Sequence, residues 1–270
     1  MKNVCNGVKN GTLIIIGGAE DKKGEKGILK EVSEQIDKEN GKFVIATIAS
    51  QLQDEVGDTY EKIFRELGIK NISILKIQTR KDTFEKNNLD IIKNASLLFF
   101  TGGDQLRITS LLGGTALYKA IKEGYKQGCV LVGTSAGASI MSDPMIIEGL
   151  DVESPRKCTL KMAPGLGLIR GVLIDQHFAQ RGRIGRLLVG IAENPECLGI
   201  GIDEDTAIIV KDSSQFSVIG SGAVYVVDGC DIVHSNVSEQ HPDEILSIWG
   251  IRLHVLKNQD SYDLIDRQPF

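Results

Sequence analysis

Short apolar runs alternate with amphipathic segments along the first hundred residues of the chain. Four runs of aliphatic and β-branched side chains, each the length of a buried strand, occupy residues 12–16, 43–48, 71–75 and 95–100. Between them, residues 27–40 and 56–67 repeat apolar side chains at three- and four-residue intervals, which predicts helices. Strands and helices in this alternating order form a parallel sheet covered on both faces. The pattern therefore predicts a mostly parallel, doubly wound α/β fold.

The second half of the chain adds strands with a different spacing. Its apolar runs occupy residues 129–132, 171–174, 198–202 and 206–210. From Phe216 onward, strands follow one another across turns at residues 220–222 and 228–229, which predicts antiparallel additions at a sheet edge. Residues 149–167 are irregular and contain two prolines, so we expect a loop over the functional site. The last dozen residues are expected to be peripheral.

Size, composition and charge limit the class of protein. The 270 residues contain no Pro/Ser-rich linker or break in composition, so we expect one domain over residues 1–270. Hydrophobic residues at 41% and charged residues at 25% are typical of a soluble globular protein with a large core. A net charge of -5 argues against nucleic acid as a partner, because phosphate binding needs a basic surface.

The N-terminus and the cysteines argue against several further classes. Residues 1–6 lack the basic and then apolar pattern of a signal peptide, and no apolar run approaches the roughly 20 residues of a membrane helix. We therefore expect a cytoplasmic protein without a membrane partner. The five cysteines are scattered without C-x-x-C spacing, which disfavours a zinc site and a disulfide framework. No metal or organic cofactor is expected.

The pentapeptide Gly133-Thr134-Ser135-Ala136-Gly137 is the strongest chemical signal in the chain. It follows the apolar run at 129–132 and leads into small and apolar residues, which is the strand, turn and helix context of a nucleophile elbow. The glycines allow the sharp turn, and the serine hydroxyl projects beyond the edge of the sheet. Ser135 is therefore the candidate nucleophile.

Two other glycine pairs also follow strands. Gly102-Gly103 ends the fourth apolar run and is expected near Ser135, because ligands collect beyond the carboxyl ends of strands in an open α/β sheet. The backbone N–H groups of Gly103 and Ala136 are candidates for an oxyanion hole. Gly17-Gly18 is interpreted as a tight turn, since no third glycine completes a G-x-G-x-x-G nucleotide motif.

A serine nucleophile needs a base, and the chain contains four histidines. His234, His241 and His254 fall in the segment of predicted edge strands. His177 comes directly after the run at 171–174, which we assign to the main sheet, so it is the candidate base.

The acid that would orient His177 is either Asp175 or Glu204, and spacing alone does not decide between them. Asp175 would lie on the same strand face as His177, with the two side chains offset by roughly 7 Å. Glu204 stands between two apolar runs and has no such restriction. With Glu204, the order would be Ser, His and acid, which differs from the α/β-hydrolase order and argues against a lipase or esterase.

Three arginines, Arg181, Arg183 and Arg186, follow His177 closely. Arginines in such a series are usually solvated. Here they follow a strand end that carries the candidate base, which favours a pocket for an anionic ligand.

The motifs around Ser135, His177, the three arginines and Glu204 resemble those of cyanophycinases. The resembling segments are Gly133-Thr134-Ser135-Ala136-Gly137-Ala138, Asp175-Gln176-His177-Phe178 with the arginines, and Gly201-Ile202-Asp203-Glu204-Asp205-Thr206-Ala207. The resemblance implies a flavodoxin-like fold similar to that of class I glutamine amidotransferases. It also implies a serine exopeptidase that degrades cyanophycin, a poly-aspartate with an arginine on each side chain, to β-aspartyl-arginine dipeptides.

By the same resemblance, Ser135 is the nucleophile, His177 the general base and Glu204 its orienting acid. The residues implied to line the substrate pocket are Gln105, Asp175, Gln176, Arg181, Arg183 and Arg186. A homodimer is implied as well. Two other hypotheses remain: a dipeptidase that acts on small aspartyl peptides, and a non-catalytic module that binds a carboxylated ligand.

Overall fold

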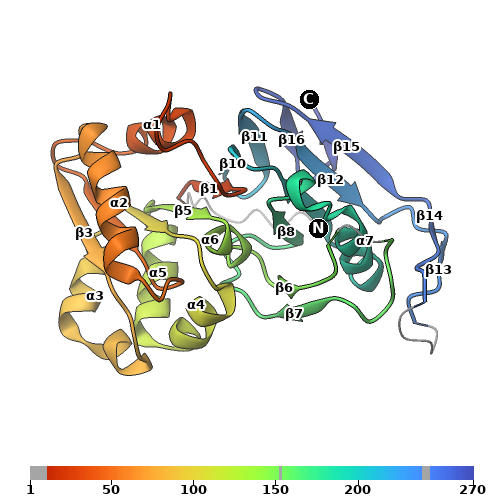
Figure 1. Cartoon of the computed structure of the whole chain (residues 1–270), viewed down its shortest axis with the longest axis horizontal. Helices are drawn as coiled ribbons and strands as arrows, with labels where there is room; N and C mark the ends of the chain where they lie inside the picture. Colours follow the sequence, from red (N-terminus) through yellow and green to blue (C-terminus); the bar gives the residue numbers. More distant parts are fainter. Residues whose placement is uncertain (1–10, 152–153, 239–243) are drawn as a thin grey trace, which may run out of the picture.

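Two β-sheets dominate the computed structural model, which describes residues 11–151, 154–238 and 244–270. The larger sheet has nine strands in the order β17-β16-β11-β10-β1-β5-β4-β2-β3, and a second sheet has four in the order β15-β12-β9-β8 (Figure 1). His241 and residues 152–153 of the expected loop lie outside the described residues.

Five parallel strands form one half of the larger sheet. In spatial order they are β1 (Leu13–Ile16), β5 (Val130–Thr134), β4 (Leu97–Phe100), β2 (Lys42–Ala46) and β3 (Asn71–Leu75). All four apolar runs of the first hundred residues lie here, so their prediction as parallel strands is confirmed. Every residue of β1, β4 and β5 is buried, which explains why these runs are apolar throughout.

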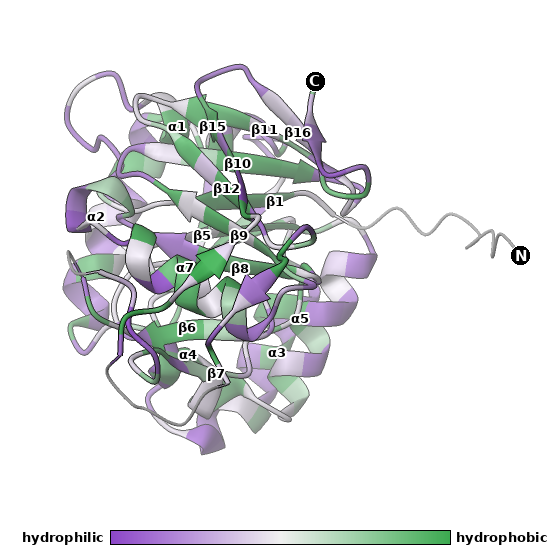
Figure 2. Cartoon of the chain, turned by 90° about the vertical axis from the view of Figure 1, so that its right-hand side faces the viewer, coloured by the Kyte–Doolittle hydropathy of each residue, from purple (hydrophilic) through white to green (hydrophobic). Residues whose placement is uncertain are grey.

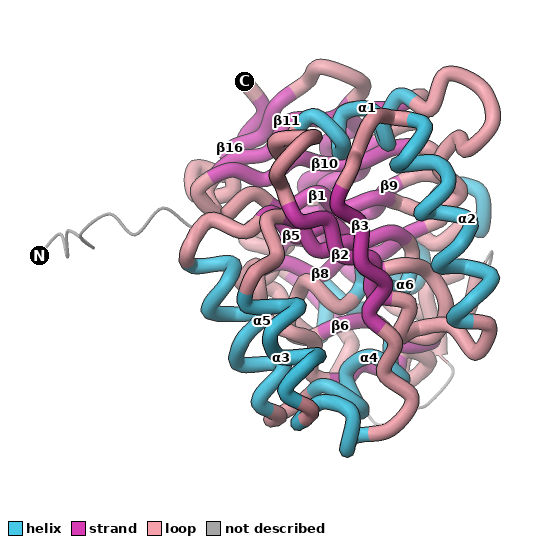
Figure 3. The backbone as a smooth tube through the Cα atoms, turned by 90° about the vertical axis from the view of Figure 1, so that its left-hand side faces the viewer, coloured by secondary structure: helices cyan, strands magenta, loops and turns pink. Residues whose placement is uncertain are grey.

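Helices cover both faces of the parallel strands. Helices α1 (Gly27–Glu34) and α2 (Gln53–Glu66) contribute to one apolar cluster, and α3 (Lys86–Lys93), α4 (Gln105–Leu112) and α5 (Ala116–Lys126) contribute to another. Side chains of β1 alternate between the clusters, with Ile14 and Ile16 in the first and Leu13 and Ile15 in the second. In Figure 3, α2 lies on one side of the strands, and α3 and α5 on the other. The doubly wound α/β prediction is therefore confirmed.

Antiparallel strands extend the larger sheet beyond β1. They are β10 (Thr206–Lys211), β11 (Gln215–Gly220), β16 (Ser261–Asp263) and β17 (Gln268–Pro269). The prediction of antiparallel additions is confirmed, and the last dozen residues, which were expected to be peripheral, form the outermost strands at this edge. These residues supply two strands, and Arg267 donates to the fully buried Asp228 over 2.7 Å.

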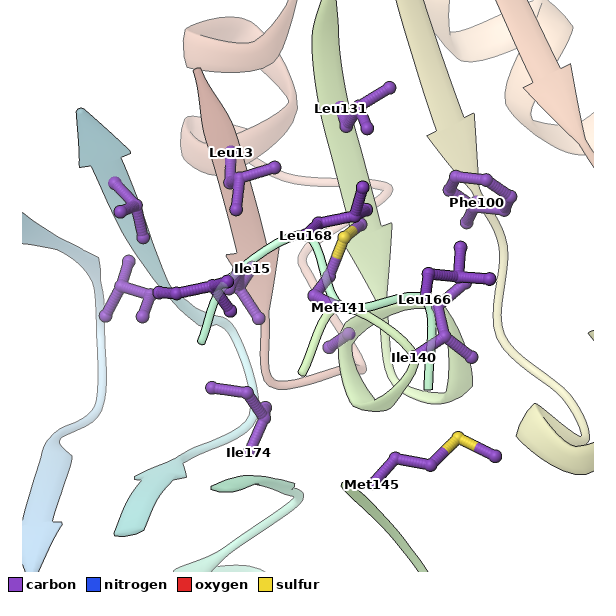
Figure 4. Packing of buried hydrophobic residues seen from close by; sticks show 14 of the residues in the cluster. Leu13, Ile15, Phe100, Leu131, Ile140, Met141, Met145, Leu166, Leu168 and Ile174 are labelled. Atoms are coloured by element: carbon purple, nitrogen blue, oxygen red, sulfur yellow. The ribbon is translucent and has the colours of Figure 1, made fainter. Parts of the chain in front are cut away.

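The second sheet corrects one assignment. It contains β8 (Val172–Gln176), β9 (Leu198–Ile202), β12 (Val224–Asp228) and β15 (Arg252–Leu256). The run at 171–174 therefore does not belong to the main sheet, because among the described strands β8 pairs only with β9, to which it is joined through helix α7 (Ile184–Glu193). The two sheets share an apolar layer in which Ile174 of β8 packs into the same cluster as Leu13 and Ile15 (Figure 4).

The irregular segment also contains regular structure. Strand β7 (Lys161–Ala163) lies within it and pairs antiparallel with β6 (Met145–Glu148). The remaining short elements are the 3-10 helices Arg80–Phe84 and Ala179–Arg181, helix α6 (Ala136–Ser139), and strands β13 (His234–Ser235) and β14 (Ile248–Trp249). Figure 2 shows hydrophobic colouring concentrated on the inner strands. Within the described ranges, no helix is both long and apolar enough to cross a membrane.

Candidate active site

Ser135 occupies a strained turn between β5 and α6. Its backbone has φ 54° and ψ −111°, a conformation that residues with a Cβ rarely adopt. Its N–H donates to the Ile16 carbonyl at 3.1 Å. A Cβ on Gly133 would lie 2.0 Å from the Gly137 carbonyl oxygen, so strand and helix can approach this closely only with glycine. The turn thus has the geometry of a nucleophile elbow.

His177 reaches Ser135 from the other sheet. Its Nε2 lies 3.0 Å from the Ser135 hydroxyl oxygen, and its own N–H donates to the Gly17 carbonyl at 2.8 Å. Although β8 and β5 belong to different sheets, the residues that follow them meet beside the end of β1. His177 therefore lies beside Ser135 although the strand that it follows was assigned to the wrong sheet.

Glu204 is the acid that contacts His177. Its Oε1 lies 2.6 Å from His177 Nδ1, and its N–H donates to the side-chain oxygen of Gln180 at 3.0 Å. Glu204 stands in the turn between β9 and β10, and its side chain is 36% exposed. Of the two acids that spacing left open, Glu204 makes this contact with His177, whereas Asp175 pairs with Arg183 and Arg186.

The surroundings of His177 favour its neutral form. Burial lowers the pKa of His177, and the positive charges of Arg181 and Arg183 lower it further, while the hydrogen bond and charge of Glu204 act in the opposite direction. The net pKa lies below the ordinary value for histidine. A neutral ring that donates Nδ1–H to Glu204 presents its Nε2 lone pair to the Ser135 hydroxyl, as a general base requires.

Gly18 lies directly against the His177 ring. A Cβ on Gly18 would fall 2.4 Å from Cε1 and 2.5 Å from Nε2 of His177, and the residue has φ 99°. The tight-turn interpretation of Gly17-Gly18 is therefore incomplete, because the turn also makes room for the ring. The sequence signal for this contact was the glycine pair itself, which stands at the end of a buried strand next to the elbow strand.

The candidate oxyanion donors lie close to Ser135. A Cβ on Gly102 would be 3.8 Å from the Ser135 hydroxyl oxygen, so the loop that includes Gly103 borders the nucleophile. Ala136 begins α6, and the first N–H groups of a helix have no acceptor within it. The loop of Gly102 and the start of α6 therefore both lie beside Ser135.

The arginine series divides into exposed and buried members. Arg181 is exposed, whereas Arg183 and Arg186 are buried and ion-paired with Asp175. Arg186 Nε donates to Asp175 Oδ2 at 2.6 Å, Arg186 Nη2 contacts Oδ1, and Asp175 is only 1% exposed. Asp175, which the resemblance implies to line the substrate pocket, therefore holds its carboxylate against two arginines, because a carboxylate buried this deeply needs its own partners.

Asp151 approaches the same two arginines from the irregular segment. Its Oδ1 accepts from Arg183 Nε at 3.0 Å and from Arg186 Nη1 at 3.2 Å, and its side chain is 36% exposed. Nothing in the sequence pattern distinguishes Asp151 from other acids. Arg181 is exposed and Asp151 is partly exposed at this end of the site.

The two glutamines differ in their contacts. Gln105 Nε2 donates to the carbonyl oxygens of Ile146 and Ile147 at 3.0 and 3.1 Å, so it ties α4 to β6. Gln176 is buried, and its Oε1 has no hydrogen-bond partner among the described residues. This oxygen is an acceptor without a donor at the end of β8. In the described part of the chain, no three His, Cys, Asp or Glu side chains cluster as they would around a metal ion.

Comparison with solved structures shows the fold. The chain is similar to a peptidase from an acI-B1 Actinobacterium, with a TM-score of 0.68 and 21% sequence identity. The superposition covers 96% of this chain and 98% of that structure.

Comparison of sequences shows the family. The chain is 38% identical over 259 residues to a cyanophycinase of Geminocystis herdmanii (strain PCC 6308), covering 96% of this chain and 95% of the relative. It is 36% identical to a cyanophycinase of Synechococcus elongatus, over 96% of this chain and 80% of that protein. The family model described as peptidase family S51 matches residues 13–218. The chain therefore belongs to peptidase family S51.

Proposed function

We propose that this protein is a cyanophycinase, a serine-type exopeptidase that hydrolyses the poly-aspartate backbone of cyanophycin to β-aspartyl-arginine dipeptides. One observation carries the proposal: Ser135, His177 and Glu204 form a hydrogen-bonded series with distances of 3.0 and 2.6 Å. They do so in a chain that is 38% identical to a cyanophycinase over nearly its whole length.

In the first half of the reaction, Ser135 Oγ attacks the backbone carbonyl carbon of the terminal aspartyl unit. His177 Nε2 takes the hydroxyl proton, and the oxyanion accepts from the N–H groups of Gly103 and Ala136. When the tetrahedral intermediate collapses, the C–N bond breaks and His177 returns the proton to the leaving nitrogen. The product is an ester between Ser135 and the acyl group.

In the second half, water replaces the leaving amine. His177 takes a proton from the water as the oxygen attacks the ester carbonyl, and then returns it to Ser135 Oγ as the acid product leaves. Glu204 accepts the Nδ1–H throughout, so it fixes the tautomer and stabilises the imidazolium that forms twice in each turnover.

Substrate recognition uses the polar end of the pocket. We assign substrate contacts to Gln105, Gln176, Arg181, Arg183 and Arg186, with Asp175 as the buried counter-ion that holds the last two in place. The exposed Arg181 suits a free α-carboxylate of the polymer, and the partly exposed carboxylate of Asp151, whose Oδ1 accepts from Arg183 and Arg186, suits a guanidinium group at its other oxygen. An acidic protein with alternating charges at its pocket matches a polymer that carries both signs.

We further propose a homodimer in the cytoplasm. Strand β15 is the edge of the second sheet, and its Leu253 and Val255 are 50% and 58% exposed, which fits a contact with a second copy. Light scattering coupled to size exclusion tests this part: a mass of one chain at all concentrations contradicts it.

The deciding experiment is mass analysis of the products released from purified cyanophycin. β-Aspartyl-arginine is the expected product, and Ser135→Ala is expected to abolish its release while polymer binding persists. Cleavage of small aspartyl peptides with cyanophycin left intact would favour the dipeptidase. Polymer binding without any turnover by the unmutated protein would favour the non-catalytic module.

A further inference from the structure

The end of β1 and the loop that joins it to α1 contact the segments that carry Ser135, His177 and Glu204. Ile16 at its start accepts from the Ser135 N–H, and the Gly17 carbonyl accepts from the His177 N–H. The Gly18 carbonyl accepts from the N–H of Asp205, the residue after Glu204, at 2.9 Å. The segment of residues 17–20, which we call the hub loop, therefore lies where the three parts of the site meet.

Glu20, at the end of the hub loop, points its carboxylate beneath the elbow. The residue is 3% exposed and its side chain is fully buried. Its Oε2 accepts from the Thr134 hydroxyl at 2.6 Å, and Thr134 immediately precedes Ser135. Its Oε1 accepts from the Tyr60 hydroxyl and lies 2.9 Å from Lys22 Nζ.

These partners hold the Glu20 carboxylate from several directions. Tyr60 comes from α2, and burial together with the Glu20 charge raises the pKa of Tyr60 well above its ordinary value. The tyrosine therefore stays a phenol that donates to Glu20. Lys22, which is partly exposed, supplies the positive charge that a buried carboxylate requires. Because Tyr60 and Lys22 hold one oxygen of the Glu20 carboxylate in place, the other oxygen can hold the Thr134 hydroxyl in place.

We propose that Glu20 is a positioning residue that acts through Thr134 to hold Ser135 in its reactive geometry. A backbone in a sparsely populated conformation, such as that of Ser135, persists only where the surroundings over-determine it. The N–H bond from Ser135 to Ile16 secures one side of the elbow, and the bond from Thr134 to Glu20 secures the other. Without the second, the turn can relax and carry the hydroxyl away from His177 Nε2.

The choice of residue type supports a role beyond filling space. A buried carboxylate is costly to desolvate, and an apolar side chain would fill the same volume without that cost. Only a carboxylate can accept from Thr134, Tyr60 and Lys22 together. The proposal rests on the proposed function to the extent that Ser135 is taken as the nucleophile.

The test measures the reactivity of Ser135 separately from the polymer. Diisopropyl fluorophosphate labels an activated serine, so the second-order labelling rate reports on the elbow, and kcat and KM for cyanophycin report on turnover. Thr134→Val removes the hydroxyl but keeps Glu20 and its contacts with Lys22. Thr134→Ser is the conservative variant, because it keeps a hydroxyl. Glu66→Gln is the control, because it removes the ion pair between Lys26 and Glu66, which also links this region to α2.

We expect Thr134→Val and Glu20→Gln to lower the labelling rate and kcat at least tenfold, with KM within twofold of the unmutated protein. Thr134→Ser should restore labelling to within threefold, and Glu66→Gln should match the unmutated protein. Circular dichroism establishes that each variant is folded. If Glu20→Gln does not fold, the comparison of Thr134→Val with Thr134→Ser decides.

Three results separate the possible failures. Normal labelling of folded Thr134→Val overturns the positioning role, even if its stability is reduced. An unmutated protein that is labelled at Ser135 but leaves cyanophycin intact overturns the proposed substrate and leaves the positioning role standing. An unmutated protein that neither reacts with the reagent nor cleaves the polymer overturns both.

Discussion

Replacement of Glu204 by glutamine tests the contact that orients His177. The change keeps the size of the side chain and removes its charge. In the structure, Glu204 Oε1 lies 2.6 Å from His177 Nδ1, which is the length of a strong charge-assisted hydrogen bond. Glutamine can still accept from Nδ1–H through its amide oxygen, so the loss concerns chiefly the stabilisation of the imidazolium in the transition state.

The size of the effect follows from the partly exposed position of the pair. A hydrogen bond to a charged group contributes a net ~1.5–3 kcal/mol. The Glu204 side chain is 36% exposed, so solvent screening does not permit a larger value. Since about 1.4 kcal/mol corresponds to a factor of ten in rate, kcat should fall roughly 10- to 150-fold. KM should change little, because Glu204 touches His177 and not the substrate.

The pH profile gives a second, independent measurement. Glu204 raises the pKa of His177, so its neutralisation lowers that pKa further. The acid limb of kcat/KM reports the protonation of the free enzyme's base, and it should move to lower pH. The assay is release of β-aspartyl-arginine from cyanophycin, followed by mass spectrometry between pH 4 and 9 in ~0.5 unit steps.

A matched control is available on the same protein. Glu25 is also a glutamate in an ion pair, 3.6 Å from Lys30 Nζ, but its side chain is 97% exposed. Glu25→Gln should leave kcat and the acid limb unchanged. A change in kcat of less than threefold for Glu204→Gln, or a shift of its acid limb to higher pH, would refute the role assigned to Glu204.

Three further substitutions test other parts of the structure. Arg181→Gln removes a charge that lowers the pKa of His177, so the acid limb of kcat/KM should move to higher pH; an unchanged profile contradicts the electrostatic argument. Gly18→Ala places a Cβ within 2.5 Å of the His177 ring and should displace the ring. A displacement of about 1 Å can lower the rate 100-fold, so kcat should fall by about that factor, while the circular dichroism spectrum stays normal. Arg267→Met leaves the fully buried Asp228 without its nearest cation and should lower the free energy of unfolding in urea by about 2 kcal/mol. This is less than the ~3–5 kcal/mol of a fully buried pair, because Arg267 is 27% exposed; no change in the urea midpoint would show that the pair does not stabilise the fold.

The sequence predicted the parallel strands because burial on both faces makes them apolar throughout. The sequence did not predict which strands pair, because an apolar run such as that of β8 has the same pattern in either sheet. Its pairing with β9 is what assigns it to the second sheet. Helix α7 was not identified, because seven of its ten residues are buried and few polar positions mark an exposed face. The prediction of a helix over 27–40 was too long, and α1 ends at Glu34.

At the site, local motifs were predictable and long-range partners were not. The elbow motif places Ser135 on a strand-to-helix turn, and His177, which follows a strand of the second sheet, meets it beside the end of β1. The partner of His177 depends on how the β9–β10 turn directs Glu204, which no spacing rule gives. The arginines illustrate the same limit: their proximity to His177 was visible in the sequence, but the burial of Arg183 and Arg186 against Asp175 depends on where α7 begins.

Because the site is divided between two sheets, the rate of turnover depends on how the two sheets pack against each other. Ser135 ends a strand of the larger sheet, and His177 follows a strand of the smaller one. Their contact therefore depends on the apolar layer between the sheets and on the link from Arg267 to Asp228. Mild heating or dilute denaturant that lets one sheet slide on the other should abolish activity before either sheet loses its secondary structure. Substitutions far from the pocket can in this way tune the rate without altering a single residue that contacts the polymer.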